Sequence, residues 1–492
     1  MGGTLELPRM FSNHMVLQRD RAVPIWGSAE PGQNVSVSFA GKNKTAQADA
    51  AGKWLLRLDP MPVNEVSGEL QVNAGASKVT YSDVVVGDVW VCGGQSNMER
   101  QLGLRGVQQP IVNWEAEAAQ ANFPLIRHFG VAQKIAEEPV TNVTGEWKVC
   151  SPETVTNFTA VGYFFARELH TNLHIPIGLL HSTIGGTNAD SWMEKKAVEQ
   201  DPTLQPLLAA EAKTEQDFPA LLAKYQADEP ALLTAYEAAL QVAQTNGGKP
   251  PNKPSPPRDP KLGNHRAGVL YNGMIAPLQP YAIRGVIWYQ GESDCGNPKL
   301  YRTLFPALIA DWRQTWGQGD FPFLFVQLAP YHGNNPELRE AQLMTSQSVP
   351  NTAMVVTTDC GDAEDIHPPN KKPIGERLAL AARALAYGEK IEYSGPIFRD
   401  AKIDDGKAIV SFTHIAGGLV AKDGELKGFA LIGADKKIVP AKAEIEGDHI
   451  LVSAPEVPQP VAVRYGWANV PDVNLYNSDG LPASPFRSDS NQ

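Results

Sequence analysis

The sequence has no long hydrophobic run, no paired-cysteine motif and no basic patch. None of its apolar stretches approaches the ~18 residues of a membrane-spanning helix. Its four cysteines include no Cys-x-x-Cys, which argues against a zinc or redox motif. Its formal net charge is −11, which argues against nucleic acid as a partner. We therefore expect no membrane span, no metal and no nucleic-acid partner, whereas the oligomeric state stays open.

The few cysteines lie near strand-like segments rather than at metal-binding spacings. Cys92, Cys295 and Cys360 each sit close to the end of an apolar, strand-like run. We expect these thiols and that of Cys150 to be free and buried, packing as small apolar groups. Disulfide bonds stay open, because four cysteines allow three different pairings.

Length and pattern together predict three parts. At 492 residues the chain is too long for one ordinary domain. Residues 1–82 contain short β segments separated by turn signals, which predicts an N-terminal β-sandwich. Residues 83–390 alternate strand and helix, which predicts an α/β catalytic domain with a mostly parallel sheet and helices on both faces. A helical and proline-rich insertion interrupts it at about 195–265, and residues 391–492 predict a C-terminal β-rich domain.

A serine follows a glycine turn at the end of the first strand of the α/β part. Val84–Val86 and Val89–Val91 are β-branched and uncharged, as in a buried strand. Gly93 and Gly94 allow a tight turn, and Ser96 comes two residues later. A serine on such a turn can expose its hydroxyl at the edge of a sheet, although the Gly-x-Ser-x-Gly spacing of a nucleophile elbow is absent.

Two later segments repeat the pattern of an apolar strand followed by polar side chains. The strand predicted at residues 284–289 runs into Gln290 and Glu292. The strand predicted at residues 353–358 runs into an acidic stretch that ends at His367. Sites in open α/β sheets form beyond the carboxyl ends of the strands. We therefore expect a serine, a histidine and an acid to converge there.

With these motifs in view, the chain resembles the sialate O-acetylesterase family, a branch of the SGNH (GDSL-like) hydrolases. The matching stretches cover nearly the whole chain and are residues 8–27, 94–98, 184–187, 269–278, 288–293, 366–388 and 476–487. The resemblance implies a three-layer α/β/α catalytic domain of SGNH type and a carboxylic ester hydrolase. It implies no metal and no organic cofactor.

Ester hydrolysis needs a nucleophile, a base and an acid that orients the base. We expect Ser96 to be the nucleophile and His367 the base. The orienting acid is less clear from the sequence, because SGNH hydrolases usually carry Asp three residues before His, where this chain has Glu364. The segment Asp-Ile-His-Pro resembles bacterial members of the family, so Asp365 is preferred. Glu364 and a serine–histidine dyad remain alternatives.

The reaction also needs donors for the developing oxyanion. We expect these to be the N–H groups of Ser96, Gly185 and Gly186 and the side-chain amide of Gln290. Gln290 stands where the wider superfamily uses Asn, and Asn97 is the alternative donor. Glu292 is expected to support Gln290 or the Ser96 loop.

The function that follows is removal of O-acetyl groups from a sugar or glycan. The family name points to O-acetylated sialic acid, and plant polysaccharides such as xylan or xyloglucan are alternatives. A catalytically inactive carbohydrate-binding protein is an alternative of another class, and the presence of both Ser96 and His367 argues against it. The N-terminus has no charged n-region and no apolar h-region. Because family members are often exported, we expect a periplasmic or secreted protein that lacks its signal peptide here, with a cytoplasmic location still open.

Overall fold

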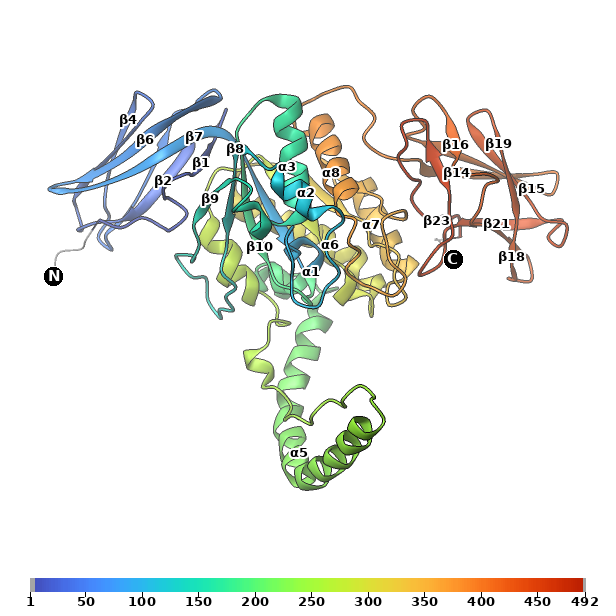
Figure 1. Ribbon diagram of the computed structural model, residues 1–492. Coiled ribbons are helices and arrows are strands. Elements are labelled where there is room, and N and C mark those ends of the chain that lie inside the picture. The colour runs from blue at the N-terminus through green and yellow to red at the C-terminus, as the bar shows by residue number, and fades with distance from the viewer. Residues whose placement is uncertain (1–4, 490–492) are drawn as a thin grey trace.

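The structure is a computed structural model that describes residues 5–489. Figure 1 shows an α/β body at the centre, a β-rich part at each end and a helical arm that projects from the body. An 11-stranded mixed sheet runs through the N-terminal part and the body. The C-terminal part is built from antiparallel sheets. The expected α/β class with flanking β-rich parts is therefore confirmed.

One long strand joins the N-terminal part to the body. The N-terminal strands are β1 (Val16–Gln18), β2 (Val23–Ser28), β3 (Asn34–Phe39), β4 (Lys42–Gln47), β5 (Lys53–Leu58), β6 (Asn64–Ala74) and β7 (Ser77–Gly94). The first residues of β7 are exposed or half-buried, whereas every residue from Val84 onward is buried. Uninterrupted burial is typical of a strand that is covered on both faces. The N-terminal half of β7 accordingly pairs antiparallel with β6, and its C-terminal half pairs parallel with β10 and β11. The strand therefore crosses the domain boundary that the sequence placed between residues 82 and 83.

The sheet of the body has the order β13-β12-β11-β7-β10-β8-β9. Its further strands are β8 (Phe123–Gly130), β9 (Trp147–Cys150), β10 (Ile177–Thr183), β11 (Gly285–Tyr289), β12 (Phe323–Val326) and β13 (Thr352–Val355). All neighbours along this path are parallel except β8 and β9. The carboxyl ends of β7, β10, β11 and β13 therefore meet at one edge of the sheet.

Helices cover the two faces of this sheet, over two separate hydrophobic cores. The helices of the body are α1 (Ser96–Glu99), α2 (Trp114–Ala119), α3 (Ala160–Leu173), α6 (Pro298–Trp316), α7 (Pro336–Ser348) and α8 (Lys372–Leu385). Trp90 packs in the core that contains α3 and α8, whereas its neighbour Val91 packs in the core that contains α6 and α7. This alternation follows from the period of a β-strand, whose side chains point to opposite faces in turn.

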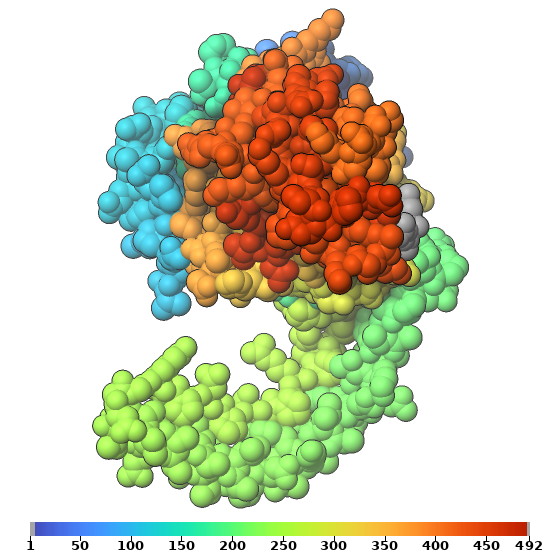
Figure 2. Space-filling model, turned by 90° about the vertical axis from the view of Figure 1, so that its right-hand side faces the viewer, coloured from blue at the N-terminus to red at the C-terminus, as the bar shows by residue number. Residues whose placement is uncertain are grey.

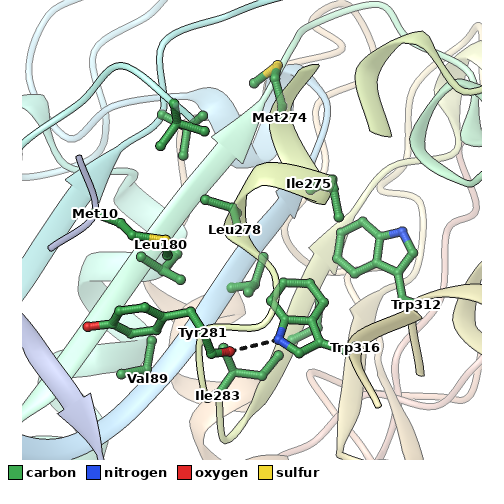
Figure 3. Close-up of a cluster of buried hydrophobic side chains, with 14 of the residues drawn as sticks. Met10, Val89, Leu180, Met274, Ile275, Leu278, Tyr281, Ile283, Trp312 and Trp316 are labelled. Carbon is green, nitrogen blue, oxygen red and sulfur yellow. Dashed lines mark hydrogen bonds between the residues drawn. The ribbon is translucent and has the colours of Figure 1, made fainter. Parts of the chain in front are cut away.

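The N-terminal part and the body share one of these cores. Figure 3 shows Met10 from the N-terminal part close to Val89 and Leu180 of the central sheet. The indole Nε1 of Trp316 donates to the carbonyl of Tyr281 at 2.8 Å in the same cluster. A continuous core of this kind couples the two parts mechanically, because interiors are close-packed.

The C-terminal part has a core of its own. Its strands are β14 (Ile397–Asp404), β15 (Lys407–Thr413), β16 (Leu419–Ala421), β17 (Phe429–Gly433), β18 (Ile438–Pro440), β19 (Lys442–Glu446), β20 (His449–Ser453), β21 (Pro460–Tyr465), β22 (Leu475–Asn477) and β23 (Phe486–Arg487). Buried Arg339 on α7 donates to the carbonyls of Ala468 and Asn469, each at 2.7 Å. The last loops of the chain are thereby fixed to the body.

The residues predicted to form a helical, proline-rich insertion build the projecting arm. α4 (Lys195–Gln200) still packs on the body, where its Val198 is buried in the core, and the arm itself consists of the long α5 (Gln205–Thr245) and an extended return segment. None of the residues of α5 is buried, and Pro219 and Pro230 lie inside it. Proline removes a helix hydrogen bond and bends the axis, and Figures 1 and 2 show that the arm leaves the body and then bends along its length. Within residues 5–489 no helix combines the length and the apolar character needed to cross a membrane.

All four cysteines are free, as predicted. Cys92, Cys150 and Cys360 are buried and Cys295 is half-buried. Burial raises the pKa of the Cys150, Cys295 and Cys360 thiols to about 12. Thiols of this kind stay protonated and act as packing groups rather than nucleophiles.

Candidate active site

Ser96 begins the short helix α1 directly after the turn that ends β7. Gly94 has φ +129°, and a Cβ there would lie 2.2 Å from the carbonyl oxygen of Tyr289. Only glycine fits such a close approach with a positive φ. The Ser96 side chain is half-buried at the carboxyl edge of the sheet. As the first helical residue, it has an N–H that finds no partner within the helix and stays free to donate.

The loop after β10 lies against Ser96. A Cβ on Gly185 would come within 3.1 Å of the Ser96 Cβ, so the missing side chain is what allows this contact. Gly186 has φ +70°, and no atom lies within 4 Å of the position of its missing Cβ. The structure thus brings together Ser96, Gly185 and Gly186, which the sequence had placed in one site.

A carboxylate that the sequence reasoning missed binds this loop. The N–H of Gly185 donates to Oε2 of Glu99 at 2.7 Å. Glu99 is held in turn by Arg105 Nη2 at 2.5 Å and by Gln133 Nε2 at 3.1 Å. An acid in the first turn of α1, three residues after the serine, was the sequence signal for it. In this structure the Gly185 N–H is therefore committed to Glu99.

His367 lies in the loop between β13 and α8. Its side chain is 20% exposed, and its Nδ1 lies 3.7 Å from Oδ1 of Asp365. Nδ1 also lies 3.4 Å from Nε2 of the Gln108 side chain. Burial is the main reason that the pKa of His367 is lowered, and the charge of Lys371 lowers it further, while Asp365 acts in the opposite direction. A lowered pKa keeps the imidazole neutral at physiological pH, as a general base requires.

The two candidate acids point in different directions. Asp365 Oδ1 accepts the backbone N–H of His367 at 2.8 Å, which holds the carboxylate beside the imidazole. Glu364 has a side chain that is 84% exposed, and its Oε1 lies 3.0 Å from Nε2 of His332. The geometry therefore favours Asp365 over Glu364 as the acid that faces His367.

Gln290 is buried, and its side-chain amide is fully occupied. Its Nε2 donates to the carbonyl of Thr187 at 3.0 Å and to Asp294 at 2.5 Å. Its Oε1 accepts from the hydroxyl of Tyr301 at 3.1 Å. A primary amide has two N–H donors, so none is left for an oxyanion. This geometry does not support the expected oxyanion role of Gln290 and gives it the role of joining the Gly185 loop to β11.

Substitution of Gln290 should reveal this joining role as a loss of stability. Gln290→Ala removes the partner of three buried polar groups, and each such loss typically costs about 1–3 kcal/mol. We expect chemical denaturation to show a clear decrease in the free energy of unfolding. The control is Gln71→Ala at a half-buried strand position whose side-chain amide has an exposed hydrogen bond to Glu69 at 3.4 Å, expected within about 0.5 kcal/mol of the unmodified protein. A Gln290→Ala protein of unchanged stability whose kcat falls ~100-fold would instead support the oxyanion role.

Asn97 connects the serine segment to the histidine segment. Its Nδ2 donates to Glu292 Oε1 at 2.6 Å and to the carbonyl of Ile366 at 3.0 Å. Its Oδ1 accepts from Nζ of Lys371 at 2.5 Å. Both Nδ2 hydrogens are thus used, and Asn97 acts as a link rather than a free oxyanion donor. Glu292 contacts the segment after Ser96 through this hydrogen bond.

Lys371 is the second residue that sequence reasoning missed. It is fully buried and precedes α8 next to the exposed Lys372. Nothing in the sequence distinguishes the two lysines, because burial of one depends on how α8 packs. Burial lowers the pKa of Lys371 to about 7, and the charge of Glu292 opposes that change. No cluster of three or more potential metal ligands is found in residues 5–489.

This arrangement, a mixed α/β sheet with serine, histidine and carboxylate groups beyond its carboxyl ends, is typical of hydrolytic enzymes. The family model described as "Carbohydrate esterase, sialic acid-specific acetylesterase" matches residues 86–225 and 261–384. The sialate O-acetylesterase of Mus musculus is 30% identical over 97% of this chain and 93% of its own length. That of Rattus norvegicus is 32% identical over 82% of this chain and 78% of its own length.

A solved structure agrees with these relatives. The crystal structure of a carbohydrate acetylesterase from Xanthomonas citri has a TM-score of 0.82 and 37% sequence identity, covering 99% of this chain and 100% of that one. The chain belongs to the carbohydrate esterase family of sialic acid-specific acetylesterases. The resemblance seen in the sequence is confirmed, and the chain is a carboxylic ester hydrolase of carbohydrate O-acetyl groups. An inactive carbohydrate-binding protein is not favoured.

Proposed function

We propose that this chain is a serine esterase with the three-layer SGNH architecture, in which Ser96, His367 and Asp365 form the catalytic triad. One observation carries the proposal: Asn97, next to Ser96, is hydrogen-bonded to Ile366, next to His367. This contact fixes the serine and histidine segments against each other at the carboxyl edge of the sheet. Asp365 is positioned by the His367 backbone, and Glu364 turns away.

The first half of the reaction forms an acetyl-enzyme. His367 Nε2 takes the proton of the Ser96 hydroxyl while Oγ attacks the acetyl carbonyl carbon. Asp365, beside Nδ1, stabilises the imidazolium that results. When the tetrahedral intermediate collapses, the bond to the sugar oxygen breaks and His367 returns the proton to that oxygen. In the second half, water attacks the acetyl group with the same base, which releases acetate and restores Ser96.

The free donors for the oxyanion are backbone N–H groups. Ser96 offers one at the start of α1, and Gly186 offers another on a loop with no side chain in the way. Gly185 joins them only when the Glu99 carboxylate withdraws from its N–H. A carboxylate beside an oxyanion is repulsive, so substrate binding must move Glu99 or leave Gly185 outside the oxyanion site.

We take O-acetylated sialic acid as the substrate class, as in the named mammalian relatives. A sialic acid carries a carboxylate, and a cation near the scissile ester favours its binding. Arg105 supplies such a cation, and its side chain is partly exposed. Arg105 contacts one oxygen of Glu99, and the other oxygen of Glu99 accepts the N–H of Gly185, which lies against Ser96.

A comparison of substrates tests this proposal. Acetate release is measured with O-acetylated sialic acid, acetylated xylan and acetylated xyloglucan. We expect the highest kcat/KM with the sialic acid, and we expect Arg105→Gln to raise KM for it without raising KM for a neutral acetylated sugar. If acetylated xylan or xyloglucan is hydrolysed better, the natural substrate is a neutral glycan and the Arg105 assignment is wrong.

A further inference from the structure

A buried lysine lies between the segments that carry the proposed nucleophile and base. Lys371 is 0% exposed and follows His367 by four residues, at the start of α8. Its Nζ lies 5.4 Å from the ring centre of Tyr289, the last residue of β11. A lysine is almost never fully buried without a specific partner. Its hydrogen-bonding partner is the side-chain oxygen of Asn97, at 2.5 Å.

The contacts on the two ends of Asn97 fix its amide. The Oδ1 end faces the ammonium of Lys371, and the Nδ2 end faces Glu292 and the carbonyl of Ile366. Rotation of the amide by 180° would place N–H donors against an ammonium and an acceptor against a carboxylate. Lys371 therefore acts together with Glu292 to keep the Nδ2 end of Asn97 on the His367 segment.

The charges around the two groups show how they influence each other. Burial is the main cause of the lowered pKa of Lys371. Glu292, the Cys360 thiol and Asp365 raise this pKa, whereas Arg100 lowers it. Burial also lowers the pKa of His367. The charges of Lys371, Arg105 and Arg100 lower it further, whereas that of Asp365 raises it. The pKa of Lys371 is about 7, whereas that of His367 lies below its ordinary value. A charged Lys371 therefore opposes protonation of His367.

We propose that Lys371 is a positioning residue of the esterase: it orients Asn97 between the Ser96 and His367 segments, and its buried charge keeps His367 in the neutral form that accepts the serine proton. This inference rests on the proposed function, because it assumes that His367 is the base. Lys371 does not touch the substrate and acts through Asn97 and through its electric field.

The test is the pH profile of kcat/KM for three variants, measured with p-nitrophenyl acetate between about pH 5 and pH 9. Lys371→Gln keeps a donor for Asn97 but removes the charge. Lys371→Met removes both. Lys372→Met is the matched control, since this neighbouring lysine is 48% exposed and pairs with Glu117 instead.

We expect the acid limb of the Lys371→Gln profile to move to higher pH, so that its activity at about pH 5.5 falls several-fold relative to its activity at about pH 8. Lys371→Met should show the same displacement and a further loss of kcat at every pH. Lys372→Met should keep the acid limb of the unmodified enzyme, because solvent screens an exposed charge.

Several outcomes would overturn the inference. One is an unmoved acid limb in a folded Lys371→Gln protein, which would leave the lysine with a purely structural role. Another needs no variant: the acid limb of the unmodified enzyme must lie below the ordinary histidine value of about 6.5, and a limb above it contradicts the inference even if both variants fail to fold. The proposed function fails separately, if Ser96→Ala remains active.

Discussion

Replacement of Ser96 by alanine should lower kcat for acetate release by roughly 10³-fold or more while the protein stays folded. The reason is that no other side chain in the proposed site replaces the hydroxyl as nucleophile. The neighbouring groups are instead committed to hydrogen bonds: Asn97 with Glu292 and Lys371, and Glu99 with Gly185. The rate is measured under single-turnover and steady-state conditions, and circular dichroism checks the fold.

The control for this experiment is Ser293→Ala. Ser293 is another half-buried serine, located just beyond the carboxyl end of β11. It should keep kcat within a few-fold of the unmodified enzyme. Acetate release at a near-normal rate by a folded Ser96→Ala protein would remove the serine mechanism altogether.

The second large effect is expected at the acid beside His367. Asp365→Asn keeps an oxygen that can accept the His367 backbone N–H but removes the charge next to Nδ1. Loss of an orienting carboxylate can lower kcat by up to about 10⁴ in a serine triad. Because Asp365 raises the pKa of His367, its removal should also move the acid limb of the kcat profile to lower pH. This direction is opposite to that expected for Lys371→Gln.

Glu364→Gln is the matched control for Asp365→Asn. It removes a carboxylate from the adjacent residue, but that side chain is solvent-exposed and pairs with His332. Its kcat should stay close to that of the unmodified enzyme from about pH 6 to pH 9. A loss confined to Glu364→Gln would show that the acid is one residue earlier than proposed. If neither variant loses more than a few-fold, the enzyme works as a serine–histidine dyad.

Local patterns in the sequence were enough to predict the class of the fold and the meeting of the Ser96 and His367 segments at one edge of the sheet. Three apolar runs predicted strands: one before Gly93, one at residues 284–289 and one at residues 353–358. The structure contains strands there as β7, β11 and β13. Parallel strands bring their carboxyl ends to one edge, so the segments of Ser96 and His367 were expected to meet. Family motifs added the chemistry, and the comparisons confirmed the esterase class.

The sequence could not predict how the polar groups at that edge pair with one another. Gln290 looked like a free donor because it follows a strand, yet Asp294, Thr187 and Tyr301 occupy its amide. The Gly185 N–H looked free for the same reason, yet Glu99 binds it. Hydrogen-bond partners far apart in the chain are chosen by side-chain packing, which local pattern does not encode.

The sequence by itself determined the α/β class, the glycine turn before Ser96 and the family, because these depend on local periodicity, on the conformational freedom of glycine and on contiguous motifs. Only the tertiary structure separated Asp365 from Glu364: the residues are adjacent in the chain, but the first side chain lies beside the imidazole and the second is exposed to solvent. It likewise distinguished Lys371 from Lys372, since one is enclosed by β11, the Asn97 turn and α8 while the other remains half-exposed. The direction and the burial of a side chain arise from long-range packing. Together they decide which charges act on the pKa of His367.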